Sequence, residues 1–265
     1  MSRIIAITNQ KGGVGKTTTC VNLAASLAAT KRRILLIDLD PQGNATMGSG
    51  INKYEVENSI CEVLLGEATI AETRLDTELA GMSVVPSNSD LTAAEVALMN
   101  AEGREHRLRD ALAEVKDEYD YILIDCPPSL NMLTLNALTA AEGVIIPMQC
   151  EYYALEGLSA LVETIEQIRA SVNPGLQIEG LLRTMFDPRN KLANDVSTQL
   201  MTHFGDRVYR TLVPRNVRLA EAPSHGLPII MYDKASRGAQ AYLALAGEIL
   251  RREQQQQPVA EAARG

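Results

Sequence analysis

The chain has 265 residues, 46% of them hydrophobic, which accommodates one large α/β domain, and two Phe with no Trp indicate an aliphatic core. Its formal net charge of −8 excludes a surface that is basic throughout. Four cysteines without a CxxC pair argue against a disulfide framework or a zinc site and fit a reducing cytosol, and no apolar run approaches the ~20 residues that cross a bilayer.

The first predicted strand, Ile4–Thr8, leads into a glycine-rich loop and then into a helical pattern over Thr17–Thr30. Glycines let backbone N–H groups turn inward onto phosphates, and the helix N-terminus adds partial positive charge. Lys16 can reach the β- and γ-phosphates of a nucleotide, and the Thr17 hydroxyl suits a Mg²⁺ ligand. The predicted phosphate contacts are Lys11, Gly12, Gly13, Val14, Gly15, Lys16, Thr17 and Thr18.

The loop departs from the common pattern G-x-x-x-x-G-K-[ST]. Gln10 stands where that pattern has its first glycine, and a second lysine, Lys11, opens the loop. A lysine this early points away from Lys16 of the same chain. A glycine-rich turn with chance lysines is the alternative, and the strand before and helix after argue against it.

The second predicted strand, Ile34–Asp38, delivers Asp38 and Asp40 to its carboxyl end. One carboxylate can hold a Mg²⁺-bound water, and the other can orient or deprotonate an attacking water. The alternative is that both aspartates cap a turn before Pro41.

A third strand, Tyr121–Asp125, ends in an aspartate suited to polarising a Mg²⁺-bound water. Cys126 follows it, and because nothing nearby predicts a lowered pKa, we interpret this residue as a small buried filler rather than a reactive thiol.

The remaining pattern alternates strands and helices. It predicts a single doubly wound, mostly parallel sheet with helices on both faces and the nucleotide at the carboxyl ends of the strands. We expect one domain over residues 1–252, a peripheral helical insert over Asn52–Leu79, and a polar, disordered tail over residues 253–265. The further strands are Ser83–Pro86, Val144–Met148, Ile178–Met185 and Val208–Val213, and the further helices include Leu133–Ala141, Leu155–Ser171 and Asp195–Phe204.

Charge is unevenly distributed. The segment Arg183–Arg237 has nine Lys or Arg and five Asp or Glu, which gives 9 − 5 = +4 and leaves −8 − 4 = −12 for the remainder. A local basic patch can neutralise nucleic-acid phosphates, whereas a solvated surface with ordinary salt bridges is the alternative. The candidates are Arg189, Lys191, Arg215, Arg218, Lys234 and Arg237.

Three segments carry a family resemblance. The loop K-G-G-x-G-K-[ST] resembles that of the P-loop ATPases that include ParA, MinD and the nitrogenase iron protein. The runs D-L-D-P-Q-G-N-A-T, from Asp38, and P-R-N-V-R-L-A-E-A-P-S-H-G, from Pro214, closely resemble segments of ParA/Soj chromosome-partitioning proteins. The resemblance covers Arg3 to about Ile249.

The resemblance implies roles for single residues in ATP and Mg²⁺ binding and in ATP hydrolysis. The catalytic residues would be Asp40, Lys16 and Lys11, of which Lys11 would reach the nucleotide of a second subunit. Thr17 with Asp125 would hold Mg²⁺. Met185, Pro214 and Arg215 would flank the adenine. The residues implied to contact DNA without reading its sequence are Arg189, Arg215, Arg218, Lys234 and Arg237, while His225 follows the pattern without a chemical role.

The resemblance also implies partners: nonspecific double-stranded DNA, a ParB-type activating protein and a second copy in an ATP-dependent homodimer, in the cytoplasm and on the nucleoid. The first alternative is a MinD-like positioning ATPase on membrane or protein cargo. However, Tyr242–Arg252 is followed by glutamines rather than by a basic amphipathic end, so we expect no membrane binding. The second alternative, a metabolic ATP-dependent enzyme, requires a substrate constellation that the sequence does not contain.

Overall fold

The computed structural model describes residues 2–262, with side chains described as far as Gln255. One eight-stranded sheet has the order β3-β4-β2-β5-β1-β6-β7-β8, and every neighbouring pair is parallel except β3 with β4. The strands are β1 Arg3–Ile7, β2 Ile34–Asp38, β3 Leu75–Asp76, β4 Met82–Val85, β5 Tyr121–Asp125, β6 Gly143–Met148, β7 Gln177–Phe186 and β8 Val208–Pro214.

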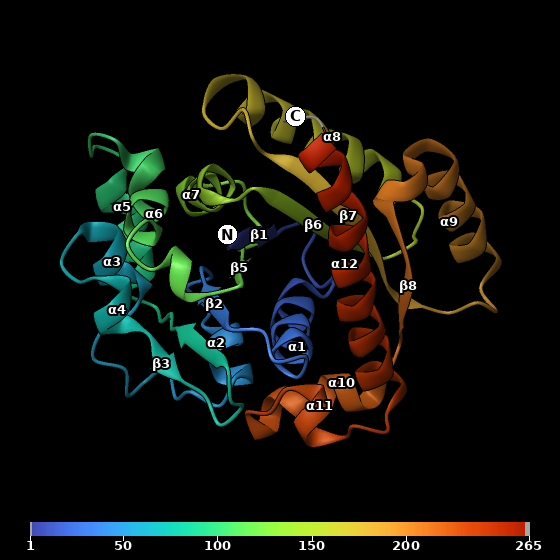
Figure 1. Cartoon of the computed structure of the whole chain (residues 1–265), viewed down its shortest axis with the longest axis horizontal. Coiled ribbons are helices and arrows are strands. Elements are labelled where there is room, and N and C mark those ends of the chain that lie inside the picture. The colour runs from blue at the N-terminus through green and yellow to red at the C-terminus, as the bar shows by residue number, and fades with distance from the viewer. Residues whose placement is uncertain (1, 263–265) are drawn as a thin grey trace.

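Helices cover both faces of this sheet (Figure 1). The α-helices are α1 Lys16–Ala28, α2 Asn44–Gly48, α3 Ile60–Leu65, α4 Ile70–Thr73, α5 Leu91–Leu98, α6 Arg107–Leu112, α7 Met132–Ala140, α8 Ala154–Ser171, α9 Lys191–Phe204, α10 Val217–Glu221, α11 Ile229–Tyr232 and α12 Arg237–Ala262, and the 3₁₀ helix η4 spans Ala222–His225.

Alternating residues of the central strand face two separate cores. Ile4 and Ala6 pack into the core under α3 and α5 to α9, whereas Ile5 and Ile7 pack into the core under α1, α10 and α12. The central strand β1 lies between β5 and β6. The connection from β1 through α1 leads to β2 on one side and covers one face, whereas the connection from β5 through α7 leads to β6 on the other side and covers the opposite face. The order of the strands therefore reverses at β1. Ligands of doubly wound folds bind in the crevice that such a reversal opens at the strand carboxyl ends.

The predicted fold class is confirmed: a single, mostly parallel sheet with helices around it. Ile34–Asp38 and Tyr121–Asp125 match their predicted bounds, and the short antiparallel edge strand β3 was not predicted. The insert was wrongly placed at the periphery, since α3 buries Ile60 and Leu64 completely in the core. A capping box, in which Ser59 and Glu62 bond each other's backbone N–H groups, begins that helix.

The chain end is also more ordered in the structure than its composition suggests. Helix α12 continues to Ala262, so residues 253–262 of the expected tail are helical, while residues 263–265 lie outside the described part. Glu253 anchors the helix to the sheet, because its carboxylate accepts from the Arg3 guanidinium at 3.0 Å and from the Tyr121 hydroxyl. Tertiary contacts therefore hold a segment whose composition is polar.

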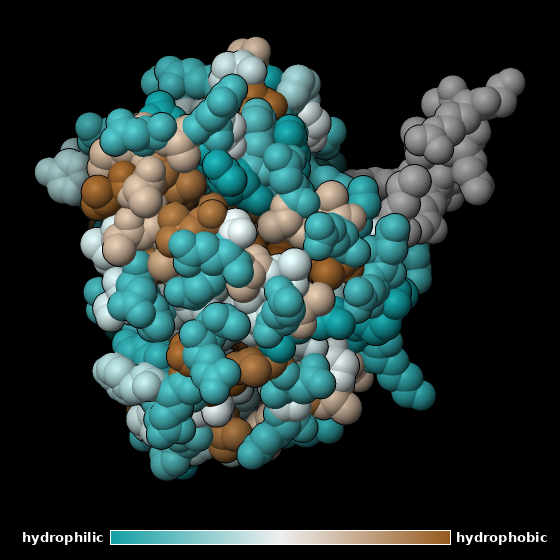
Figure 2. All heavy atoms as spheres, turned by 90° about the vertical axis from the view of Figure 1, so that its left-hand side faces the viewer, coloured by the Kyte–Doolittle hydropathy of each residue, from teal (hydrophilic) through white to brown (hydrophobic). Residues whose placement is uncertain are grey.

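The side of the molecule that carries α3 to α5 is mostly hydrophilic (Figure 2). Hydrophobic atoms gather in the upper part of this view, which is the level at which α5 lies in Figure 1. Val96 on α5 is 60% exposed, and Met99, the C-cap of this helix, is 53% exposed. Among residues 2–262, no helix is both long and apolar enough to cross a membrane.

Candidate nucleotide site and neighbouring basic surface

The phosphate loop connects β1 to α1 at the centre of the sheet edge. Gly13 and Gly15 have φ of 71° and 87°, backbone conformations that side chains other than glycine rarely adopt. Gly15 is also the N-cap of α1, and no side chain caps this helix. The first N–H groups of α1 are therefore available to an anion, as the sequence predicts.

Two side chains, one just before the loop and one on β7, hold the loop in place. The Asn9 amide donates to the Pro147 carbonyl at 2.8 Å and accepts from the Lys11 N–H at 2.9 Å. The Thr184 hydroxyl, on β7, donates to the Val14 carbonyl at 2.7 Å. These bonds fix the loop before any ligand arrives, which reduces the conformational entropy that binding must remove.

Lys16 lies inside the loop and is 7% exposed. Its ammonium donates to the carbonyl of Lys11 at 3.2 Å. Burial lowers the pKa of Lys16, and the carboxylate of Asp125, the first of the opposing groups, partly compensates. A buried cation with one carbonyl partner is a ready contact for the phosphates of a nucleotide.

Asp125 is the second buried charge at this edge. It pairs in register with Asp38 on β2, is fully buried, and neither of its carboxylate oxygens has a hydrogen-bond partner among the described residues. Burial first, and Asp38 next, raise the pKa of Asp125 well above its ordinary range, whereas the Thr17 hydroxyl and Lys16 lower it. Unsatisfied carboxylate oxygens beside a threonine hydroxyl fit a Mg²⁺ ion, which prefers oxygen ligands.

Asp38 uses its carboxylate to hold the segment that follows β2. It accepts from the Thr46 N–H and hydroxyl at 2.7 Å each, and from the Asp40 N–H at 3.2 Å. Complete burial nevertheless raises the pKa of Asp38 to about 6. These bonds give Asp38 a supporting role.

Asp40 is only partly buried. One carboxylate oxygen accepts from the Gln42 N–H at 3.0 Å, and the Ser87 hydroxyl donates to the Asp40 carbonyl at 2.8 Å. The charge of Asp40 affects the pKa of Asp125 and Lys16, so it lies near both. Its backbone is thus held by Ser87 and its charge lies near these two buried groups, which suits a group that orients water.

The predicted base-binding residues lie at the same sheet edge. Phe186 and Pro214 pair across β7 and β8, so Met185 and Pro214 emerge side by side, and Arg215 follows exposed. Met185 has a φ of 49°, a left-handed conformation that costs a non-glycine residue about 1–3 kcal/mol. Such strain is concentrated at functional sites.

Lys11 projects from the loop toward a different partner than Lys16 does. Its ammonium lies 2.5 Å from the carboxylate of Glu151, and both side chains are about half exposed, at 48% and 51%.

Cys126, which follows β5, is 1% exposed, and burial raises the pKa of its thiol. This residue is therefore a buried filler, as interpreted from the sequence.

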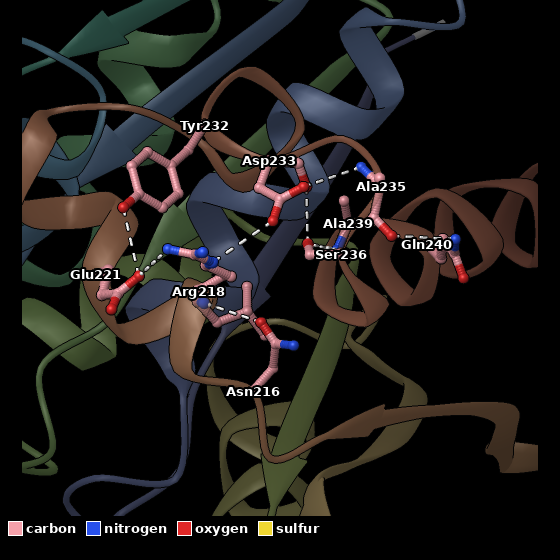
Figure 3. Close-up of polar contacts among 10 residues, drawn as sticks. Asn216, Arg218, Glu221, Tyr232, Asp233, Ala235, Ser236, Ala239 and Gln240 are labelled. Carbon is pink, nitrogen blue, oxygen red and sulfur yellow. Dashed lines mark hydrogen bonds and ion pairs between the residues drawn. The ribbon is translucent and has the colours of Figure 1, made fainter.

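Two of the predicted DNA-contacting arginines have acidic partners. Arg218 on α10 pairs with Glu221 at 2.9 Å and with Asp233 at 3.6 Å (Figure 3). Arg189 pairs with Asp187 at 2.8 Å, and this partner lowers the pKa of Asp187 to about 2.

The other predicted contacts are exposed and form no ion pair with a described residue. They are Arg215, Lys234 and Arg237, and Lys191 shares these properties. Helix α10 contacts both α11 and α12, so Arg218 and Arg237 belong to one surface, and Arg215 lies close enough to Asp187 to lower its pKa.

Several supporting residues escaped the sequence analysis. Asn9 and Thr184 hold the loop, and Asn22 joins α1 to α11, because its amide donates to the Thr18 carbonyl at 2.7 Å and accepts from the Ile229 N–H at 2.6 Å. Glu151 and Glu221 are the ion-pair partners of predicted site residues. Two of these residues stand near a recognised motif: Asn9 lies two residues before Lys11, and Glu221 lies within the run that begins at Pro214.

The chain is similar to known proteins over nearly its full length. A family model for an AAA domain matches residues 2–178. The chain is 55% identical to the chromosome partitioning protein ParA of Myxococcus xanthus over 258 residues, which are 97% of this chain and 91% of that protein. It is 54% identical to the sporulation initiation inhibitor protein Soj of Bacillus subtilis over 249 residues, 94% of this chain and 98% of that one.

A solved structure of similar fold is the cobyrinic acid a,c-diamide synthase of Mycobacterium smegmatis with bound ADP and magnesium. It is 38% identical, has a TM-score of 0.84, and the similarity covers 96% of each chain. The family match spans more than half of the chain, and the named relatives share about half of its residues over nearly the full length. The chain therefore belongs to the ParA/Soj family of chromosome-partitioning ATPases.

Proposed function

We propose that the chain is an ATP-dependent switch that binds nonspecific DNA as an ATP-bound dimer and releases it after hydrolysis. The observation that carries the proposal is the buried amide of Asn22, which is 4% exposed and joins the phosphate-loop helix to α11 through the bonds to Thr18 and Ile229. Helix α11 contacts α10 and α12, which carry part of the basic surface, so Asn22 connects the nucleotide site to that surface.

The nucleotide end of this connection binds ATP and Mg²⁺ and hydrolyses the ATP. Lys16 and the loop N–H groups bind the ATP phosphates, while Thr17 and Asp125 hold Mg²⁺, which supplies a positive charge that stabilises the transferred phosphoryl group. Asp40 orients the attacking water. The Mycobacterium smegmatis protein of the same fold was solved with an ATP analogue and magnesium, which supports this ligand pair.

Lys11 links ATP binding to dimerisation in this proposal. Lys11 of each subunit contacts the nucleotide of the other, so the ATP state is the dimeric state. Two subunits double the basic surface formed by Arg189, Arg215, Arg218, Lys234 and Arg237, which raises the affinity for DNA. A ParB-type protein accelerates hydrolysis, and the protein works in the cytoplasm on the nucleoid, with residues 1–252 as the ATPase domain.

The test is binding to a double-stranded DNA of arbitrary sequence without nucleotide, with ADP, with ATP and with a slowly hydrolysed ATP analogue. We expect binding only with ATP and the analogue, and loss of that binding in Arg218→Glu with dimerisation retained. Dimers that bind no DNA in any state contradict the proposal. In that case binding to anionic liposomes tests the MinD-like alternative, which is supported by structural similarity to MinD of Pyrococcus horikoshii at 26% identity and a TM-score of 0.77.

A further inference from the structure

Arg218 faces two carboxylates (Figure 3). Its Nη1 lies 2.9 Å from Glu221 Oε2, and its Nε lies 3.6 Å from Asp233 Oδ2. The arginine side chain is 54% exposed, and those of Glu221 and Asp233 are 40% and 34% exposed. We call Glu221 and Asp233 the carboxylate clamp of Arg218.

The clamp is held in position by its own neighbours. The Tyr232 hydroxyl donates to Glu221 Oε2 at 3.3 Å, and the Tyr232 ring stacks on that of His225 with centroids 4.9 Å apart. The other carboxylate, of Asp233, accepts from the Ala235 N–H at 3.2 Å and thereby begins the turn into α12 (Figure 3). Both carboxylates therefore take part in local contacts besides the one with Arg218.

The charges at this position oppose the binding of a polyanion. A phosphate that reaches the open edge of the Arg218 guanidinium is attracted by one positive charge and repelled by the two negative charges of the clamp. The neighbouring Arg215, Lys234 and Arg237 have no such partner among the residues with described side chains. Arg218 thus has two acidic partners on this surface, whereas Arg189 has one, Asp187.

We propose that Glu221 and Asp233 limit the DNA affinity of this surface, because a DNA phosphate must replace them as the partner of Arg218. The inference rests on the DNA binding proposed above and adds two residues that determine its strength. When a positive side chain neutralises a DNA phosphate, a counterion is released into solution, and this release increases the affinity for DNA. An arginine already neutralised by the clamp releases no net counterion, whereas an arginine freed from the clamp releases about one.

The test uses the full chain with a slowly hydrolysed ATP analogue and a fluorescent double-stranded DNA of arbitrary sequence. Anisotropy is measured from about 50 to about 200 mM salt for the wild type, Glu221→Gln and Asp233→Asn. Both variants keep the shape of the side chain and remove its charge. We expect each to bind DNA about three- to tenfold more tightly, with the slope of log affinity against log salt steeper by up to about 0.9 per protomer.

Two control variants separate this effect from net charge and from folding. Glu166→Gln removes one negative charge and breaks the Arg169–Glu166 pair of α8, which has the same spacing and a distance of 2.9 Å, on the opposite face of the sheet. We expect no change in its DNA affinity beyond twofold. Glu221→Asp keeps the charge and should keep the salt slope of the wild type.

The outcomes separate the inference from the function on which it rests. A wild type that binds DNA, with Glu221→Gln and Asp233→Asn at the same affinity and slope, overturns the inference alone. Weaker binding by both variants also overturns it, since the carboxylates would then orient Arg218 for the phosphate. A wild type that binds no DNA in any nucleotide state overturns the proposed function and this inference together.

Discussion

The Lys11 ammonium and the Glu151 carboxylate lie 2.5 Å apart, which joins the first residue of the phosphate loop to the segment before α8. Because both side chains are about half exposed, the pair contributes no more than ~1 kcal/mol to the free energy of unfolding. Lys11 must leave this partner to reach a nucleotide on a second subunit. The pair therefore belongs to the resting monomer in the proposed cycle.

Release of Lys11 should favour the dimer. We expect Glu151→Gln to strengthen dimerisation about two- to fivefold with a slowly hydrolysed ATP analogue, since less free energy is needed to free the lysine. Sedimentation equilibrium measures the effect, and Glu156→Gln on the exposed surface of α8 is the matched control. Weaker dimerisation of Glu151→Gln would instead make Glu151 part of the interface.

Removal of the buried ammonium should abolish nucleotide binding. We expect Lys16→Ala to weaken ATP binding at least about a hundredfold, because the variant loses a charge-assisted contact in a water-poor site. Isothermal titration calorimetry with ATP and Mg²⁺ measures the loss. Lys116→Ala, an exposed lysine in the turn before β5, should bind ATP as the wild type does. Normal ATP affinity of Lys16→Ala would exclude its phosphate role.

Asp40 should affect hydrolysis more than binding. We expect Asp40→Asn to lower the ATP hydrolysis rate about 10²- to 10⁴-fold while ATP affinity changes little, since a group that orients water acts on the chemical step. Asparagine keeps the side-chain oxygen that accepts from the Gln42 N–H, so the local turn is preserved. Phosphate release in single turnovers measures the rate, with Asp76→Asn as the control. An unchanged rate removes Asp40 from catalysis.

Stability without ligand should decrease as the pH rises through the lower acidic range. Burial raises the pKa of Asp38 from 3.8 to about 6, so between these values the folded chain holds more protons than the unfolded chain. The free energy of unfolding therefore falls with rising pH in this window, by on the order of 3 kcal/mol for this group. Asp125, whose pKa is also raised, acts in the same direction.

Urea unfolding from about pH 4 to about pH 7 measures this dependence. We expect Asp38→Asn to flatten the curve, because asparagine does not titrate and its side-chain oxygen still accepts from Thr46. The variant should be closest to the wild type at the acidic end, where Asp38 of the wild type is protonated. An equally steep curve in Asp38→Asn would assign the pH dependence to other groups.

The sheet was predictable because its strands are buried on both faces and are thus almost entirely apolar. Ile34–Asp38 and Tyr121–Asp125 are examples, and each ends at the residue where the polar site begins. The edge strand β3 escaped because two exposed residues carry no pattern. The helical end of α12 escaped because Glu253 is held by Arg3, a contact 250 residues away along the chain.

The sequence by itself determined the phosphate loop, the lysine inside it and the acidic residues at the strand ends. Positive φ at Gly13 and Gly15 and the strand–loop–helix order depend on neighbouring residues, so local sequence specifies them. Tertiary structure alone decided that the Asp125 carboxylate has no hydrogen-bond partner among the described residues, that Glu151 holds Lys11, and that Asp233 shares Arg218 with Glu221. Partners of buried and surface charges depend on distances between segments remote in sequence, which the packing of the whole chain sets.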